Sequence, residues 1–198
     1  MIPTLTAQQV AFFAKNGFLE LEGILNPEEI AQIGKLKPGR DLWRTTPVLK
    51  RLLLSRKLRT ITFALSGKDR LMLALDHCFE PNFSLEHSEK LKSLFSVQGL
   101  SLCVFFQAQE PPSIDAPKLG HHPFCQAVGN ILIVRPELLI TWPSFPSTVY
   151  LASYCHLNAL YVDNPRDPAA GALRALGYEY GDPLRAETHP LLQRADHR

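Results

Sequence analysis

The chain has 198 residues, of which 45% are hydrophobic and 20% charged, and its formal net charge is +2. These values are typical of a globular protein and exclude an intrinsically disordered chain. No apolar run is long enough to span a membrane, and the N-terminus lacks the features of a signal peptide. We therefore expect a cytoplasmic protein. Its four cysteines are widely spaced, which predicts reduced thiols and neither a disulfide framework nor a zinc knuckle; they are Cys78, Cys103, Cys125 and Cys155.

A helix and a strand are predicted at the start of the chain. Thr6 and Gln9 have the spacing of a capping box, in which each side chain binds the other residue's backbone N–H. The helix should cover residues 7–15 and end at Gly17, which tolerates a left-handed backbone. Residues 18–22 then alternate between apolar and polar, as in a half-buried strand.

Further helices follow. Asn26 and Glu29 repeat the capping box before a second helix that should end before Pro38. A third helix is predicted after Thr46-Pro47, with a further short helical piece over residues 58–65.

From residue 70 onward the pattern indicates strands, because short apolar runs are separated by Pro-, Gly- and Asp-rich stretches. Helices followed by strands favour an α+β fold in which the helices pack on an antiparallel sandwich or barrel. We expect a single domain, 1–198, with a helical part (1–69), a β-rich core (70–165) and a C-terminal helix and tail (166–198). The helix in this last part should begin near Asp167-Pro168 and end at Gly177. The predicted strands are 71–75, 100–106, 131–134, 149–154 and 157–162.

Several stretches, taken in order, carry a resemblance to a known family. They are Leu5-Thr6-Ala7-Gln8-Gln9-Val10-Ala11-Phe12-Phe13, Asn16-Gly17-Phe18-Leu19, Glu22-Gly23-Ile24-Leu25, Asp41-Leu42-Trp43 and Gly129-Asn130-Ile131-Leu132-Ile133-Val134. The chain resembles the phytanoyl-CoA dioxygenase-like proteins, most clearly over its first 75 residues. The resemblance implies a double-stranded β-helix (jelly-roll, cupin-like) core. It also implies iron(II) and 2-oxoglutarate chemistry, which needs a His-x-Asp/Glu pair, a distant histidine and a cation for 2-oxoglutarate.

The sequence departs from this ligand pattern. His87-Ser88-Glu89 supplies a His-x-acid pair, although residues 85–92 also fit a solvated, helix-compatible surface segment. The distal histidine is expected within residues 138–141, where none occurs, and the next histidine is His156. The expected cation is missing from residues 147–150.

We therefore assign no catalytic, cofactor-binding or metal-binding residue and no cofactor. This predicts a pseudoenzyme that acts as a binding module for a small molecule or a protein. The alternative is an active iron(II)/2-oxoglutarate-dependent dioxygenase whose non-standard ligands are His87, Glu89 and His156.

A second histidine motif, His121-His122, lies near a predicted loop. Imidazole suits iron, zinc and nickel, but adjacent residues in an extended chain point to opposite sides. An ordinary polar loop is therefore favoured over a metal site.

The charge distribution suggests another hypothesis. Residues 35–70 contain eleven Lys and Arg but two Asp, a local net charge of +9 that leaves −7 for the rest of the chain. Such clusters bind phosphate backbones or anionic surfaces, with Trp43 as a stacking platform, although charged helix faces are more often simply solvated. The candidate cations are Arg40, Arg44, Lys50, Arg51, Arg56 and Lys57. Glycine-rich phosphate loops and a Gly-x-Ser-x-Gly elbow are absent from the sequence, so nucleotide binding and acyl transfer have no support.

Overall fold

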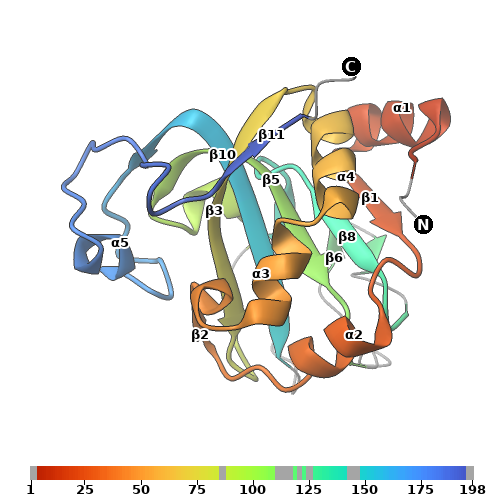
Figure 1. The fold of residues 1–198 in the computed structure, drawn as a ribbon, viewed down its shortest axis with the longest axis horizontal. Coiled ribbons are helices and arrows are strands. Elements are labelled where there is room, and N and C mark those ends of the chain that lie inside the picture. Colours follow the sequence, from red (N-terminus) through yellow and green to blue (C-terminus); the bar gives the residue numbers. More distant parts are fainter. Residues whose placement is uncertain are drawn as a thin grey trace.

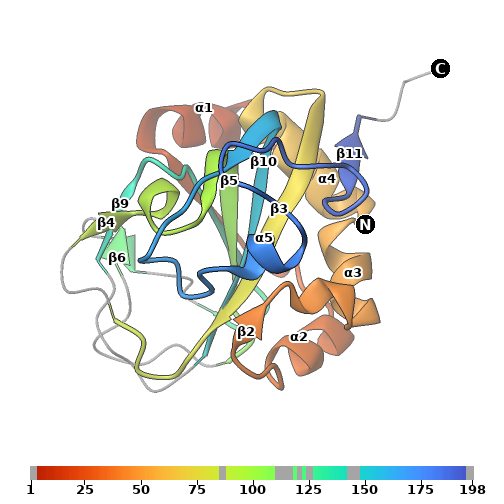
Figure 2. The same cartoon turned by 90° about the vertical axis from the view of Figure 1, so that its left-hand side faces the viewer.

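Two antiparallel sheets form the centre of the fold (Figures 1 and 2). The computed structural model describes residues 4–84, 88–109, 127–141 and 148–194, with the backbone of 118–119 and 122–123. Among these residues the larger sheet contains β1 (Phe18–Leu21), β2 (Gly39–Arg40), β3 (Arg70–Phe79), β5 (Val97–Phe106), β8 (Ile131–Val134), β10 (Val149–Tyr161) and β11 (Leu191–Gln193). The smaller sheet contains β4 (Glu89–Lys90), β6 (Lys118–Leu119), β7 (His122–Pro123) and β9 (Leu139–Thr141).

The order of the strands identifies the fold. The larger sheet runs β1-β8-β5-β10-β3-β11, with β2 beside β3, and the smaller sheet runs β4-β9-β6-β7. The chain passes from β3 in one sheet to β4 in the other and back to β5, and it repeats this exchange through β8, β9 and β10. Two facing sheets linked in this way form a double-stranded β-helix, or jelly roll. The predicted α+β class and β-helix core are therefore confirmed.

Three helices, α2 (Pro27–Ile33), α3 (Pro47–Leu53) and α4 (Arg56–Ser66), cover the face of the larger sheet that is turned away from the smaller one (Figure 2). The first helix, α1 (Ala7–Asn16), lies at the upper end of the fold in this view and contacts β1 and α4. Two short 3₁₀ helices, η1 (Leu42–Arg44) and η2 (Leu91–Ser93), and the single turn α5 (Ala172–Ala175) lie in connections. Among the described residues, none of the helices has the length and apolar character needed to cross a membrane.

The predicted capping boxes are both present. The Thr6 side chain accepts from the backbone N–H of Gln9, and the Gln9 side chain accepts from that of Thr6. Asn26 and Glu29 make the same reciprocal pair at the start of α2. Gly17 ends α1 with φ of 78°, a backbone conformation that few other residues adopt without strain.

The larger sheet is apolar on both faces. Leu49, Leu53 and Ile61 from the helices pack fully buried against one face, together with Leu71 and Leu73 of β3. The opposite face packs towards the smaller sheet through a second cluster that includes Phe105, Leu132, Ile140 and Leu151. Each fully buried leucine or isoleucine contributes roughly 1.5–3 kcal/mol to folding, so burial on both sides stabilises the central strands.

Two predictions for the second half of the chain are wrong in detail. The strands predicted over 149–154 and 157–162 are one strand, β10, whose register against β5 shifts on both sides of Cys155. The helix expected from Asp167 starts only at Ala172, because the Asp167 carboxylate accepts from the backbone of Ala169 and forms a turn there. The polar run at 85–92, where it is described, contains the short strand β4 and the start of the 3₁₀ helix η2.

Candidate functional site

A pocket of about 480 Å³ lies at the C-terminal end of β3. Strand β2 and the turn before it form one wall, since Gly39 and Arg40 pair with Cys78 and His77 of β3. Residues 79–83, which continue from β3, and residues 166–169 of the C-terminal part complete the lining. The pocket therefore combines segments that are far apart in the sequence.

A buried ion pair supports the pocket. Arg40 binds Asp167 through its Nη2 atom, and the two side chains are 8% and 1% exposed. Asp167 also accepts from the backbone N–H of Ser96 at 2.7 Å and of Ala169 at 2.9 Å. The Arg40 guanidinium lies over the Phe95 ring, 5.1 Å from its centre. Arg40 is thus held by three different segments and projects a rigid cationic group beside the pocket.

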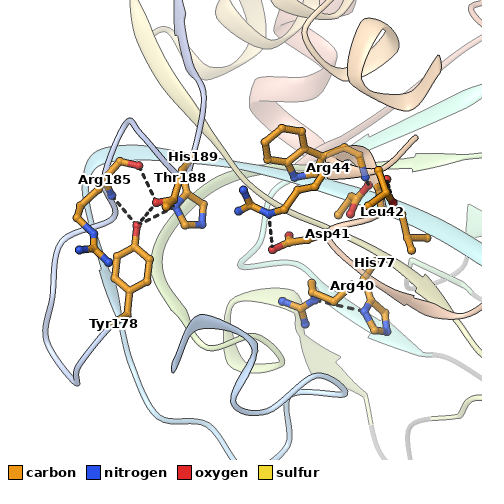
Figure 3. A network of polar contacts seen from close by, with 12 residues as sticks. Arg40, Asp41, Leu42, Arg44, His77, Tyr178, Arg185, Thr188 and His189 are labelled. Carbon is orange, nitrogen blue, oxygen red and sulfur yellow. Dashed lines mark hydrogen bonds and ion pairs between the residues drawn. The ribbon is translucent and has the colours of Figure 1, made fainter. Parts of the chain in front are cut away.

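His77 is a neutral polar group in the pocket lining. Its Nδ1 atom accepts from Arg40 Nε at 3.3 Å (Figure 3). Burial lowers the pKa of His77 to about 4, and the positive charge of Arg40 adds to this effect. The imidazole is therefore neutral at pH 7, with its proton on Nε2. Its ring packs edge-on against Phe79, which in turn contacts Phe83.

Behind the pocket, Asp76 is fully buried on the other side of β3. Its Oδ2 atom accepts from the backbone N–H of Trp43 at 2.9 Å and from the Tyr150 hydroxyl at 2.5 Å. Burial is the main cause that raises the pKa of Asp76 to about 6; the charge of Asp41 acts in the same direction, and the hydrogen bond from Tyr150 opposes the shift. Asp41 itself pairs with Arg44, whose Nε lies 3.2 Å from Asp41 Oδ2. Burial raises the pKa of Asp41, although Arg44 and Arg40 oppose the shift.

A C-terminal cluster adjoins this group (Figure 3). The Tyr178 hydroxyl accepts from the backbone N–H of Arg185 and lies 3.0 Å from His189 Nδ1. His189 is 1% exposed. Burial lowers its pKa to about 4, and the charge of Arg44 contributes. The C-terminal segment thus lies close enough to Arg44 for the charge of that residue to act on His189.

The two segments expected to meet at a metal site do meet. Glu89 in β4 pairs with Ile140 in β9, inside the stretch where the distal histidine was expected. Hydroxyl groups occupy this place, however, instead of the expected histidine: the Ser88 and Thr141 hydroxyl oxygens are 2.8 Å apart. Glu89 forms an ion pair with Arg166, which lines the pocket. His87 lies outside the described residues.

The remaining candidates are not assembled into a site. His156 follows Cys155, which pairs with Met72 near the start of β3, whereas the pocket lies at the other end of that strand. The side chains of His121 and His122 lie outside the described residues, as does Cys125. The other three cysteines are buried free thiols. In the described ranges, no group of three or more His, Cys, Asp or Glu side chains could hold a metal ion.

The basic segment is neutralised in part within the fold, since four of its eleven cations form ion pairs with acidic residues. Arg51 pairs with Glu28 at 2.9 Å and Lys57 with Glu29 at 2.6 Å, while Arg40 and Arg44 pair with aspartates. Four of the six cations predicted to contact nucleic acid therefore have an acidic partner. Lys50 and Arg56 are exposed on the surface of α3 and α4.

We accordingly expect the six candidate cations to give weak retention on heparin. Lys50 and Arg56 are the two of them without an acidic partner among the residues that the structure describes, so together they should contribute no more than about 2 to the slope of log K against log salt. The measurement is elution across a salt series at pH 7.5, with Lys50→Ala/Arg56→Ala as the test variant and Lys15→Ala/Lys92→Ala as control. Tight binding with a slope of −5 or steeper would instead establish a phosphate-binding surface.

Sequence comparisons give no match, either to a protein-family model or to a curated protein. Solved structures with a similar fold exist. The non-haem α-ketoglutarate-dependent carbocyclase SnoK from nogalamycin biosynthesis has a TM-score of 0.72 at 14% identity, covering 96% of this chain and 97% of its own. CytC3 with Fe(II) and α-ketoglutarate has a TM-score of 0.64 at 13% identity, covering 98% and 92%. HygX from Streptomyces hygroscopicus with iron bound has a TM-score of 0.57 at 14% identity, covering 93% and 99%.

α-Ketoglutarate is another name for 2-oxoglutarate. The similarities therefore show that this chain has the fold of the iron/2-oxoglutarate oxygenases. They correct one prediction. The assignment of no cofactor is wrong for this fold, because similar structures contain iron and α-ketoglutarate. They also agree with the conditional prediction that any enzyme of this kind would be a non-haem iron 2-oxoglutarate-dependent one.

The described residues do not fit an iron ion in the manner expected from the sequence. The carboxylate of Glu89 is ion-paired with Arg166, and a hydroxyl stands at Thr141 where an imidazole was expected. Hydroxyls are weaker ligands for iron(II) than imidazole or carboxylate groups. The Arg40–His77–Asp167 set was missed by sequence reasoning, because its members are isolated polar residues with no motif spacing.

Proposed function

We propose that the protein binds a small molecule in the pocket at the end of β3, as a binding module built on the oxygenase fold. One observation supports this most directly: the pocket has about 480 Å³ and combines aromatic rings with a few fixed polar groups. Ligand sites typically occupy roughly 300–1,000 Å³ and have this composition. The order of the N-terminal elements further supports placing the chain with the phytanoyl-CoA dioxygenase-like proteins.

The lining suggests which ligand features would be recognised. Phe79 and Phe83 offer ring surfaces, and the Nε2–H of neutral His77 is a hydrogen-bond donor. Arg166 is 67% exposed at the rim and is already paired with Glu89. A ring-containing molecule with a hydrogen-bond acceptor matches these groups.

A pair of neighbouring alanines provides the test. Ala169 lines the pocket, whereas exposed Ala170 does not. In saturation-transfer NMR with a library of ring-containing fragments, we expect binders to the wild-type protein and to Ala170→Trp. Ala169→Trp should lose them, because its indole would fill the pocket. Fragments that bind Ala169→Trp equally well, or a complete lack of binders, would contradict the proposal.

A second candidate function is that of an iron(II)/2-oxoglutarate oxygenase with non-standard ligands. It is favoured by the pairing of Glu89 with Ile140, which brings the His87-Ser88-Glu89 segment to β9. Its test is anaerobic calorimetry with iron(II), alone and with 2-oxoglutarate. Micromolar binding that is lost in His87→Ala and Glu89→Ala but kept in Glu22→Ala, at an exposed position, would support it. Absence of binding, or binding unaffected by these changes, would remove it.

A further inference from the structure

The group of acidic and basic residues behind the pocket contains unpaired polar atoms. Within the described part of the chain, Asp41 Oδ1, Asp76 Oδ1, Arg44 Nη2 and His189 Nε2 are buried without a hydrogen-bond partner. A buried polar atom left unpaired typically costs about 1–3 kcal/mol, and folded proteins contain few of them. Four such atoms in adjoining residues therefore indicate that these residues form hydrogen bonds with one another that still have to be identified.

The two aspartates are equivalent in one respect. Each uses its Oδ2 atom as an acceptor, Asp41 from Arg44 and Asp76 from Trp43 and Tyr150, and each leaves Oδ1 unused. They are also adjacent, since the backbone N–H of Asp41 donates to the carbonyl oxygen of Asp76 at 3.0 Å. Two ionised carboxylates cannot bind one another, but one proton turns one of them into a donor for the other.

We propose that Asp41 and Asp76 share one proton in the folded protein, and that this carboxyl–carboxylate hydrogen bond fastens residues 40–44 to β3. The environment of Asp76 supports this, because burial and the charge of Asp41 raise its pKa to about 6. Because the two groups are coupled, the proton belongs to the pair.

The other two unpaired atoms are complementary without any added proton. Figure 3 shows the Arg44 guanidinium between the Asp41 carboxylate and the His189 ring. Arg44 Nη2 is a donor, and neutral His189 with its proton on Nδ1 offers Nε2 as an acceptor. Arg44 Nη2 and His189 Nε2 thus need no added proton to act as donor and acceptor, and a proton is needed for the carboxylates alone.

The shared proton adjoins the pocket. Asp41 follows Arg40 and Asp76 precedes His77, and Arg40 pairs with His77 across β2 and β3. When the proton leaves as the pH rises through about 6, repulsion between the carboxylates displaces this segment and the two pocket residues with it. Regulation of ligand binding by this step rests on the proposed function, whereas the shared proton does not. Other charged or titratable groups that act on the pair or adjoin it are Arg40, Arg44, Cys78, Tyr150, Tyr154 and His189.

Carboxyl ¹³C NMR against pH tests the shared proton. We expect an Asp76 midpoint between pH 5 and 7 in the wild-type protein. Asp41→Asn should move it down by at least one pH unit, because the amide donates to the Asp76 carboxylate and the neighbouring charge is gone. Asparagine also tolerates the left-handed backbone of residue 41, where φ is 57°. Asp69→Asn, at an 80% exposed side chain, is the control and should leave the midpoint unchanged.

Two further measurements make the result independent of Asp41→Asn folding. The His77 ring signal should shift with the same midpoint as Asp76, and this shift should disappear in Asp76→Asn. The Tm of Asp76→Asn relative to the wild type should rise from pH 5 to pH 7.5, because the amide keeps the donor when the carboxyl has lost it. An Asp76 midpoint near 4, a midpoint that Asp41→Asn leaves in place, or a Tm difference independent of pH would each overturn the shared proton. None of these results depends on a ligand, so the pocket proposal stands or fails separately.

Discussion

Replacing Asp167 with alanine is expected to destabilise the protein by about 3–5 kcal/mol, the cost typical of removing one partner from a buried ion pair. The change leaves Arg40 buried without its carboxylate, and it removes the acceptor of the Ser96 and Ala169 backbone N–H groups. Urea unfolding at pH 7.5 measures the difference through the midpoint and slope of the transition.

Asp163→Ala is the matched control. Its ion pair with Arg174 is exposed, at 52% and 61%, so its loss should cost no more than about 1 kcal/mol. The double variant Arg40→Met/Asp167→Ala should be more stable than the sum of the two single changes predicts, because no unpaired charge remains. Additive effects, or a loss equal to that of Asp163→Ala, would show that the buried pair does not stabilise the fold.

Acidification is expected to destabilise the protein by a net amount of about 3 kcal/mol between pH 6.5 and pH 4. His77 and His189 have a pKa of about 4 in the folded protein against 6.5 when unfolded. Their contribution is present above pH 6.5 and is lost as the pH falls towards 4, by about 3 kcal/mol each. Asp76 acts in the opposite direction, because its raised pKa of about 6 favours the folded state as the pH falls from 6 to 3.8, by about 3 kcal/mol.

Urea unfolding at several pH values, on the wild-type protein and on histidine variants, checks this balance. His77→Asn and His189→Asn keep an amide near the position of Nδ1 but cannot take up a proton. Each should remove roughly half of the histidine contribution to acid sensitivity. His156→Asn is the control, since that histidine is partly exposed and should change the profile little. A wild-type stability that is flat or rises from pH 6.5 to 4 would show that these histidines are not buried in neutral form.

The parts of the fold that follow from short sequence signals were predictable. Capping boxes at Thr6 and Asn26 involve residues three apart, and β8 is a compact apolar run flanked by polar residues. Strand β10 was divided in two between residues 154 and 157, where the polar His156 interrupts its apolar pattern. In the structure the strand continues through this position, and its register against β5 shifts there, with Cys155 opposite Leu100 and Leu160 opposite Gln98.

The candidate site was less predictable, because it depends on long-range pairs. Arg40 and Asp167 are 127 residues apart, and neither stands in a motif. The basic segment suggested an exposed surface, yet Lys57 folds back onto Glu29 and the carbonyl of Ile24. Net charge along the chain does not reveal which cations have partners in space. The hydroxyl pair of Ser88 and Thr141 carried no sequence signal at all.

The strand order also has a consequence for how the chain reaches its folded state. Among the strands that the structure describes, the first one, β1, pairs with β8 alone, at the edge of the larger sheet, and this pairing joins Phe18 to Val134. During synthesis β1 therefore cannot form its strand pair until more than a hundred further residues have left the ribosome. Central β10 in turn joins β3 to β5 after both have been made. Such non-local pairing predicts folding on the millisecond-to-second scale, with unpaired strand edges exposed to chaperones in the meantime.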